Sequence, residues 1–260
     1  MGKFTIKEEN IVKEHKAKVT ETLWQTIKSN LKTICWAIVI AGIIRSLMFE
    51  PFHIPSSSMK DTLLIGDFII VSKSSYGYSK YSFPFAMLPI KERILAKKPQ
   101  RGDVVVFRLP SNPKINYIKR LIGIPGDKIE VVNGKIYLND KLVSREFDSQ
   151  YYDQDDTNTM MLKYKETLPN DKSYYVLDQI ADGLKDNTPI YIVPQGHYFF
   201  MGDNRDNSQD SRYLNKVGFV SEEYLIGKAK IIFMSSKESL LKFWLWGKNI
   251  RFKRIFRKIT

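Results

Sequence analysis

The sequence predicts a mostly β fold built from antiparallel sheets, and two observations support this. Short runs rich in Val, Ile, Tyr and Phe recur between turn residues, which is typical of strands. No helical period of about ten residues separates these runs, so a parallel sheet made of alternating strands and helices is not expected. A chain of 260 residues with 43% hydrophobic and 13% aromatic content is long enough to bury the core of one or two domains.

The N-terminal part is expected to hold one membrane anchor. Residues 1–32 are mostly polar and are predicted to be a cytoplasmic segment, while residues 33–49 form an apolar run interrupted only by Arg45. With that arginine reaching toward the interface, the run reaches the lower end of the roughly 17–25 residues that span a bilayer. Lysines precede the run and Glu50 follows it, so the positive-inside rule predicts a single-pass membrane protein with a cytoplasmic N-terminus. A buried core helix is the alternative reading.

The remainder is predicted to lie on the extracytoplasmic side and to fold as strands. The Asn133-Gly134 pair between two of the apolar runs is a strong signal for a two-residue hairpin. Residues 144–190 are acidic, polar and poorly periodic, and are interpreted as an inserted, smaller β-rich subdomain. It would divide a catalytic core into a first part, 50–143, and a second part, 191–236. The expected strands lie at 67–73, 103–109, 115–124, 128–138, 189–194, 197–203 and 228–234.

The positive charge is concentrated at the two ends of the chain. Of the formal +13, residues 1–32 carry +3 and residues 237–260 carry +7, whereas a nucleic-acid binder more often has its basic patch on the folded domain. The tail 237–260 mixes aromatic residues with Lys and Arg, which suits an anionic lipid surface, and the apolar residues 83–88 could contact the same surface. A solvated, partly disordered tail is the alternative.

Cysteine and histidine give no indication of a metal site or a disulfide. Cys35 is the only cysteine, and His15, His53 and His197 are scattered without a Cys/His cluster. No bound metal is expected.

Three consecutive serines, Ser56, Ser57 and Ser58, are candidates for a nucleophile, which also needs a base and donors for an oxyanion. In the expected strand around Lys119, the period of two gives this lysine apolar and aromatic neighbours on its own face. If that face is buried, desolvation lowers the pKa of Lys119 and makes it a usable general base. Alternatively, Lys119 reaches solvent and Arg120, which points the other way, pairs with an acid.

A polar stretch at residues 201–212, MGDNRDNSQDSR, allows two readings. It can be a tight loop held by charge-assisted hydrogen bonds, or one of its hydroxyls can orient the base.

Five motifs in order resemble type I signal peptidases, also called leader peptidases. They are PSSSM, TLLIGD, RGDVVVF, YIKRLIGIPGD and GDNRDNSQDSR, and they follow the apolar run within residues 50–233. These enzymes are Ser/Lys endopeptidases that remove signal peptides from exported preproteins. The resemblance implies an antiparallel, sheet or barrel-like catalytic core, cleavage after small residues at −1 and −3, and no cofactor.

The resemblance also implies a role for individual residues. Ser58 matches the nucleophile, Lys119 the general base, and Ser56 a hydroxyl that helps the Ser58 N–H form the oxyanion hole. Ser208 matches a residue that positions the lysine. The supporting ion pairs match Asp210 with Arg212 and Asp203 with Arg120. The walls of the substrate pockets match Ile54, Pro55, Met59 and Tyr117.

Two residues depart from the family pattern, and two other functions stay open. Ser57 stands where a small residue such as Gly is usual, and Asp61 stands where Pro is common, so a carboxylate near Lys119 could raise its pKa. The favoured reading is that Asp61 is solvated, pairs with Lys60 or caps the turn at Leu63. The alternatives are a hydrolase with a Ser-His-Asp triad that uses His53 or His197, and a membrane-anchored β module that binds partners without catalysis.

Overall fold

The structure, a computed structural model, describes residues 24–26, 28–42, 47–83, 90, 93–153, 159–179, 183–238 and 246–260. The chain divides into two compact units, Met1–Arg45 and Ser46–Thr260. Residues 84–88 of the expected apolar loop 83–88, and residues 239–245 of the basic tail, lie outside the described residues.

In the first unit, residues 24–26 and 28–42 are helical, and their side chains are exposed. None of the helices among the described residues has both the length and the apolar character needed to cross a membrane. The expected span 33–49 is helical over residues 33–42, and residues 43–46 are not described. Its last residue, Phe49, instead begins the first strand and pairs with Ser72.

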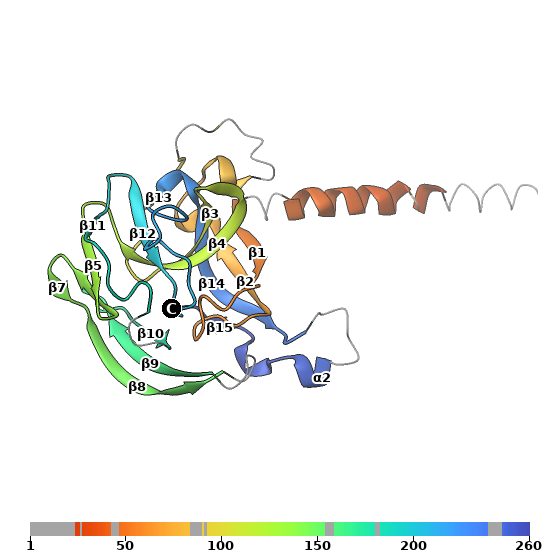
Figure 1. Cartoon of the computed structure of the whole chain (residues 1–260). Coiled ribbons are helices and arrows are strands. Elements are labelled where there is room, and N and C mark those ends of the chain that lie inside the picture. Colours follow the sequence, from red (N-terminus) through yellow and green to blue (C-terminus); the bar gives the residue numbers. More distant parts are fainter. Residues whose placement is uncertain are drawn as a thin grey trace, which may run out of the picture. The chain divides into compact units, whose positions relative to one another are not determined.

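The second unit contains three sheets, and every pairing between their strands is antiparallel (Figure 1). The largest sheet has eight strands in the order β1-β2-β14-β3-β4-β12-β13, with β15 paired to β14. Its strands are β1 (Phe49–His53), β2 (Asp67–Ser72), β3 (Val104–Leu109), β4 (Asn112–Gly123), β12 (His197–Met201), β13 (Val220–Ser221), β14 (Leu225–Ser235) and β15 (Arg257–Lys258).

Two smaller sheets come from the middle of the chain. The four-stranded sheet has the order β11-β5-β6-β7 and the three-stranded sheet the order β10-β9-β8. Their strands are β5 (Lys128–Val132), β6 (Lys135–Leu138), β7 (Lys141–Leu142), β11 (Tyr191–Ile192), β8 (Ser144–Tyr152), β9 (Met160–Thr167) and β10 (Ser173–Asp178). The expected hairpin joins β5 and β6, with positive φ angles of 48° and 72° at Asn133 and Gly134. We call β8–β10 the inserted sheet.

Short helical elements connect the strands. They are η1 (Lys73–Ser75), η2 (Lys80–Ser82), η4 (Glu222–Tyr224), α2 (Trp246–Asn249) and η6 (Phe252–Arg254).

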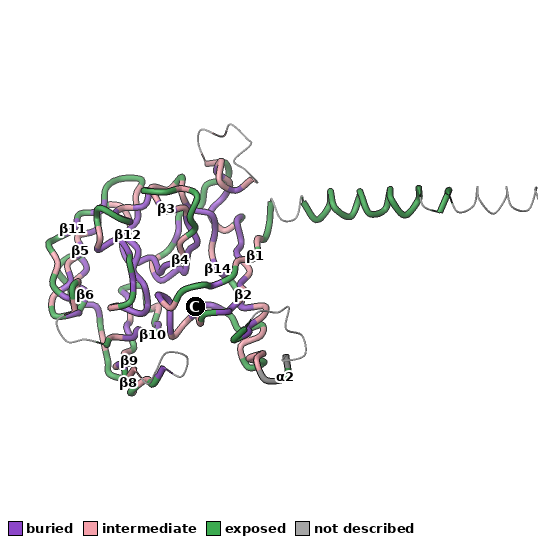
Figure 2. Tube along the Cα trace, turned by 45° about the vertical axis from the view of Figure 1, so that its right-hand side comes forward, coloured by how far each residue is buried: buried purple, intermediate pink, exposed green. Residues whose placement is uncertain are grey.

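The buried residues form three clusters, and two of them bring separate segments together. One unites Val131 of β5 and Val176 of β10 with Ile122 and Phe199 of the large sheet. Because this cluster draws on all three sheets, the inserted sheet shares its core with the large sheet. β3 is buried along most of its length, whereas β4 is buried only over Lys119–Gly123 (Figure 2).

A second cluster lies beneath the segment between β1 and β2. Ile54, Met59 and Leu63 of this segment pack with Ile69 of β2 and with Ile259, which follows β15. The last residues of the basic tail are therefore part of the folded domain, where Arg254 Nη2 donates to the Thr62 carbonyl at 3.0 Å and to Asp67 Oδ2 at 2.6 Å. Phe252 and Phe256 of the same tail are 64% and 73% exposed.

Candidate active site

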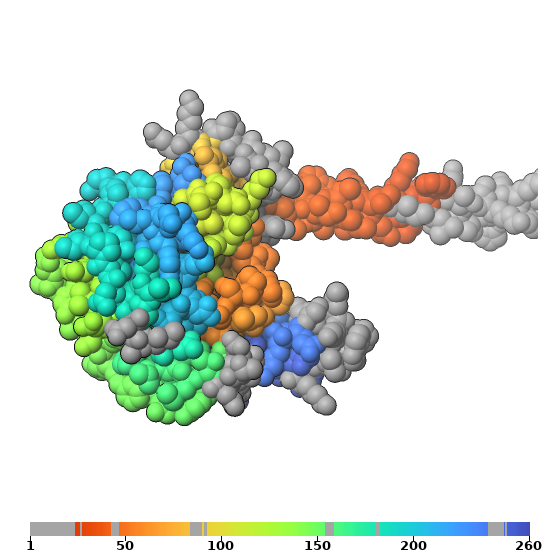
Figure 3. All heavy atoms as spheres, in the orientation of Figure 1, coloured from red at the N-terminus to blue at the C-terminus, as the bar shows by residue number. Residues whose placement is uncertain are grey.

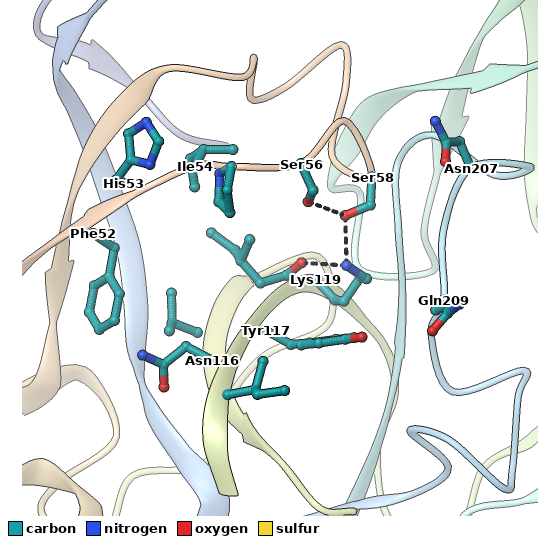
Figure 4. Close-up of a pocket in the computed structure, with 14 residues that line it drawn as sticks. Phe52, His53, Ile54, Ser56, Ser58, Asn116, Tyr117, Lys119, Asn207 and Gln209 are labelled. Atoms are coloured by element: carbon teal, nitrogen blue, oxygen red, sulfur yellow. Dashed lines mark hydrogen bonds between the residues drawn. The ribbon is translucent and has the colours of Figure 1, made fainter. Parts of the chain in front are cut away.

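Ser58 lies in a tight turn that follows β1. The Lys60 N–H donates to the Ser57 carbonyl at 3.0 Å, and the Leu63 N–H donates to the Met59 carbonyl at 2.7 Å. Met59 and Leu63 are fully buried, so their side chains fix the turn to the core below it. Ser58 itself is 8% exposed. This turn presents its hydroxyl toward β4 (Figure 4).

Lys119 reaches Ser58 from β4. In the antiparallel register of β3 and β4 it pairs with Val105, and its side chain is only 4% exposed. Its Nζ donates to Ser58 Oγ at 2.7 Å and to the Ile118 carbonyl at 3.0 Å (Figure 4). The lysine thus lies in a buried position directly against the hydroxyl.

Burial is the main cause of the altered acidity of this lysine. Desolvation lowers the pKa of Lys119 from 10.5 to about 8, although the charges of Asp210 and Asp203 oppose the shift. The expectation of a desolvated lysine in this strand is met, and the alternative in which it reaches solvent is wrong. An amine with this pKa, in contact with a hydroxyl, can take up the hydroxyl proton near neutral pH.

Arg120 points to the other side of β4 and forms a buried bidentate ion pair. Its Nε and Nη2 donate to Oδ1 and Oδ2 of Asp203, each at 2.8 Å, and both side chains are 1% exposed. Nη1 of Arg120 also donates to the Thr260 carbonyl at 3.0 Å. The pair therefore links β4, the loop after β12 and the end of the tail.

Asp210 and Arg212 form a second buried pair in the loop after β12. Arg212 donates from Nε at 2.8 Å and from Nη2 at 2.9 Å. Burial alone would raise the pKa of Asp210, but Arg212 and the Gly202 N–H hold it below its usual value.

The two other serines of the expected site lie beside the first. Ser56 Oγ is 3.4 Å from Ser58 Oγ. Ser208 Oγ is buried, but the two hydrogen bonds that Lys119 donates go to Ser58 and Ile118 rather than to Ser208.

Gly202 is a residue of this site that the sequence reasoning missed. A Cβ atom there would lie 2.2 Å from Ser208 Oγ and 2.6 Å from the Ser58 carbonyl oxygen. Only a residue without a side chain lets these two serines approach the loop so closely. The available signal was its place as the first residue of the motif GDNRDNSQDSR. In the structure, the Asn204 N–H of the same motif donates to the Ser58 carbonyl at 3.1 Å.

A cavity of about 350 Å³ opens beside Ser58 and Lys119. Ile54, Pro55 and Tyr117 line it as the sequence led us to expect, whereas Met59 is fully buried in the core and is not one of the lining residues. In the space-filling view, the orange segment after β1, yellow-green β4 and the cyan-to-blue segment after β12 surround a hollow (Figure 3).

The sequence reasoning missed three polar residues of this lining, namely Asn116, Asn207 and Gln209. Asn116 belongs to the face of β4 opposite Lys119 in a strict alternation, so a period of two gave no sign of it. Asn207 donates from Nδ2 to Ser57 Oγ at 2.8 Å, which gives the unusual serine at that position a partner.

The histidines are not placed as a catalytic base would be. His53 lines the cavity, but the hydroxyl of Ser58 is bonded to Lys119 and Ser56. His197 is at the start of β12, where its Nδ1 lies 2.9 Å from the Gln195 carbonyl. His15 lies outside the described residues.

Asp61, the second departure from the family pattern, is turned toward the inserted sheet. Its Oδ2 lies 2.6 Å from Lys163 Nζ of β9. The charges that shift the pKa of Lys119 are those of Asp210, Asp203 and Arg212, and Asp61 is not among them.

Among the described residues, one cluster of carboxylates has its oxygen atoms close enough together to hold a metal ion. One oxygen from each of Asp178, Asp186 and Asp206 lies within 4.8 Å of the others. Arg145 pairs with Asp178, and the Gly183 N–H donates to Asp186 at 2.7 Å, so two of these carboxylates already have protein partners. The cluster is not part of the cavity lining.

Comparisons with known proteins show which family this chain is similar to. The family model described as signal peptidase, peptidase S26, matches residues 27–234. A signal peptidase I of Rickettsia typhi (strain ATCC VR-144 / Wilmington) is 42% identical over 254 residues, which cover 90% of this chain and 95% of the relative. One of Rickettsia prowazekii (strain Madrid E) is 42% identical over 255 residues, with the same coverage.

Among solved structures, a signal peptidase I from Enterococcus faecalis V583 is 28% identical and covers 51% of this chain and 97% of its own, with a TM-score of 0.30. The family model matches most of the chain, and the curated relatives are matched over nearly their whole length. The chain belongs to the signal peptidase family, peptidase S26.

Proposed function

We propose that this peptidase is a membrane-bound serine endopeptidase that uses Ser58 and Lys119 to remove signal peptides from exported preproteins. The observation that carries the proposal is the 2.7 Å contact between Lys119 Nζ and Ser58 Oγ, made by a lysine whose pKa is lowered to about 8. A buried amine of this kind supplies the base that a serine nucleophile requires.

The reaction is an acyl transfer. Neutral Lys119 takes the proton of Ser58 Oγ as this oxygen attacks the carbonyl carbon of the scissile bond. The oxyanion receives hydrogen bonds from the Ser58 N–H and the Ser56 hydroxyl. Collapse of the intermediate breaks the C–N bond, and Lys119 passes its proton to the leaving amine, which is the N-terminus of the mature protein.

Deacylation uses the same groups in reverse. Lys119 takes a proton from water as the water oxygen attacks the acyl carbon. The ester C–O bond then breaks, Lys119 returns this proton to Ser58 Oγ, and the signal peptide leaves with a new C-terminal carboxyl group, which loses its proton to solvent. The pairs Arg120–Asp203 and Asp210–Arg212 hold β4 and the loop after β12 in place around Lys119, and the buried Ser208 packs against Gly202 in the same loop. No metal or cofactor has a role in these steps.

The cavity suits a substrate with small side chains near the cut. Ile54, Pro55 and Tyr117 form apolar walls around a space of about 350 Å³. Such walls favour small residues at −1 and −3, as in the A-x-A pattern of signal peptides. Met59 contributes from beneath, through the packing of the turn.

The proposed location is the plasma membrane, with residues 1–32 in the cytoplasm, residues 33–49 as the anchor and the catalytic domain outside. This rests on the apolar run and its flanking charges. The core parts 50–143 and 191–236, the insertion 144–190 and the lipid-binding tail 237–260 are part of the same proposal. A protease-protection assay on vesicles tests it, because digestion of the catalytic domain from the cytoplasmic face would contradict it.

Cleavage of a preprotein in detergent tests the chemistry. We expect Ser58→Ala and Lys119→Ala to be inactive, and His53→Ala and His197→Ala to keep activity. Full activity of Lys119→Ala would exclude the dyad, and loss of activity only in a histidine variant would favour a triad. A family member without catalysis would cleave nothing in any form.

A further inference from the structure

The turn after Ser58 carries a buried cation that the proposed chemistry does not use. Lys60 Nζ lies 2.5 Å from Asp153 Oδ2, and the two side chains are 2% and 4% exposed. Asp153 immediately follows β8 of the inserted sheet. A charge buried this deeply is stable only with a partner, so the two residues are tied to each other.

A second ion pair with the opposite arrangement of charges lies beside the first. Asp61 supplies the carboxylate and Lys163 of β9 the ammonium, 2.6 Å apart, with 23% and 18% of the side chains exposed. Strands β8 and β9 pair along their length, and the Asp153 N–H donates to the Thr159 carbonyl at 3.2 Å. Both pairs therefore join one hairpin of the inserted sheet to two consecutive residues of the turn.

The backbone connects Lys60 to the serines. The Lys60 N–H donates to the Ser57 carbonyl at 3.0 Å, so Lys60 cannot move without moving the peptide that precedes Ser58. Neither Lys60 nor Asp153 is among the residues that line the cavity. Any influence on the reaction must therefore pass through the position of Ser58.

We infer that the inserted sheet is a positioning element for Ser58, and that the Lys60–Asp153 pair is its main link. The inference rests on the proposed role of Ser58 as the nucleophile. The pair fixes the turn so that the Ser58 hydroxyl stays within hydrogen-bonding distance of Lys119. The more exposed Asp61–Lys163 pair adds a weaker restraint.

Stability and positioning can be separated with a double variant. Lys60→Met removes the ammonium from beside the buried Asp153 carboxylate, and Asp153→Asn removes the carboxylate from beside the buried Lys60 ammonium, so each single change destabilises the fold. Lys60→Met/Asp153→Asn removes both charges of the pair. Thermal unfolding, kcat and KM are measured for all three variants on the full chain in detergent with a preprotein substrate.

We expect the double variant to regain most of the thermal stability of the wild type but not its kcat. A displacement of Ser58 by about 1 Å lowers kcat roughly 10- to 100-fold with little change in KM. The pH at half-maximal rate should remain near the pKa of Lys119, about 8, because Lys60 is not among the groups that shift it. Lys163→Met should lower kcat less than Lys60→Met does.

Arg101→Met is the matched control, because Arg101 forms a pair with Asp127 at 2.5 Å, with side chains 17% and 6% exposed, outside the cavity lining. It should lower thermal stability and leave kcat unchanged. The inference is overturned if kcat recovers with stability in the double variant, if the double variant is as unstable as the single ones, or if Lys60→Met keeps wild-type kcat. Ser58→Ala, assayed alongside, separates this result from a failure of the proposed nucleophile.

Discussion

Lys119 shows how one side chain is made reactive at the expense of stability. Its neighbour Arg120 forms a bidentate pair with the carboxylate of Asp203, whereas Lys119 donates to a hydroxyl and a backbone carbonyl. Burial therefore acts on Lys119 with little compensation, and its pKa falls to about 8. The neutral amine that the proposed mechanism requires is therefore more abundant near neutral pH than it is in a solvated lysine.

The rate of cleavage should rise with pH and reach half of its maximum near pH 8. The reason is that only neutral Lys119 accepts the Ser58 proton, and its pKa is about 8. A profile of kcat/KM against pH measures this in the free enzyme. Asp61→Asn is the control and should leave the midpoint unchanged, since the carboxylate is paired with Lys163. A midpoint above pH 10 in the wild type would contradict the shift.

Lys119→Met should unfold at a higher temperature than the wild type below pH 8. The protonated lysine is disfavoured in the fold by its shift from 10.5 to about 8, which corresponds to about 3 kcal/mol. Between pH 8 and 10.5 the folded lysine is neutral while the unfolded one keeps its proton, so the wild type gains relative stability as pH rises. The difference should therefore shrink over that window. Equal stability at all pH values would refute this expectation.

Gly202→Ala should lose nearly all activity. The new Cβ would meet Ser208 Oγ at 2.2 Å and the Ser58 carbonyl oxygen at 2.6 Å, so the turn must shift away from Lys119. Because such a shift is comparable to 1 Å, we expect kcat to fall roughly 100-fold. Gly123→Ala is the control, since its Cβ would meet the end of the Ile129 side chain at 2.2 Å. It should reduce thermal stability without a matching loss of kcat.

The sequence assigned the tail 237–260 to the lipid surface, yet strand β15 and the residues on either side of it form part of the fold. β15 pairs with β14, Ile259 enters the core, and Arg254 reaches Asp67, which is fully buried. A sequence of alternating cations and aromatics does not distinguish these residues from those that face outward. The partner of Arg254 lies almost 190 positions earlier, and no local pattern identifies it.

Arg254→Met should lower the free energy of unfolding by about 2 kcal/mol, because hydrogen bonds to a buried carboxylate are lost. Asp67 would keep the bonds from Ser235 and the Leu64 N–H, which limits the damage. Chemical denaturation of the two variants Arg254→Met and Lys253→Met gives the comparison. Lys253 is exposed, so its variant should match the wild type within about 0.5 kcal/mol. Equal effects of both variants would argue against the pairing.

For the molecule as a whole, the sequence was a good guide to the strands and to the residues around Ser58. All seven expected runs contain strands, because period-two patterns and turn residues are local signals. Which strands pair with one another in each sheet was harder to predict from the sequence. Residues 128–142 were assigned to the core's first part, but β5–β7 join β11 in a separate sheet, a pairing between segments about 60 residues apart.

The same limit applies to the candidate site. Lys119 and Ser58 could be paired from motifs, and the burial of Lys119 from its neighbours in the strand. The partner of Asp61, the place of Met59 beneath rather than beside the cavity, and the contact of Gly202 with Ser58 depend on three-dimensional packing.

The uneven charge of the molecule leads to a test of the proposed lipid surface. Lys253, Arg257 and Lys258 are exposed cations in the part of the tail that the structure describes. Replacing all three with Gln should weaken binding of the protein to vesicles of anionic lipid by roughly 100-fold at low salt, since each charge contributes about 1 kcal/mol. Co-sedimentation with anionic and with neutral vesicles measures this. Unchanged binding to anionic vesicles would show that other residues hold the protein there.

The contact between Arg254 and the Thr62 carbonyl has a consequence for biosynthesis. A ribosome produces the Ser58 turn long before it produces residues 250–259, yet these residues supply Arg254, Ile259 and the strand that pairs with β14. Until they emerge, the turn has its neighbours from β2 but not this second support, and Asp67 lacks one of its cations. The Ser58 turn of the nascent chain therefore lacks this support until residues 250–259 have been synthesised.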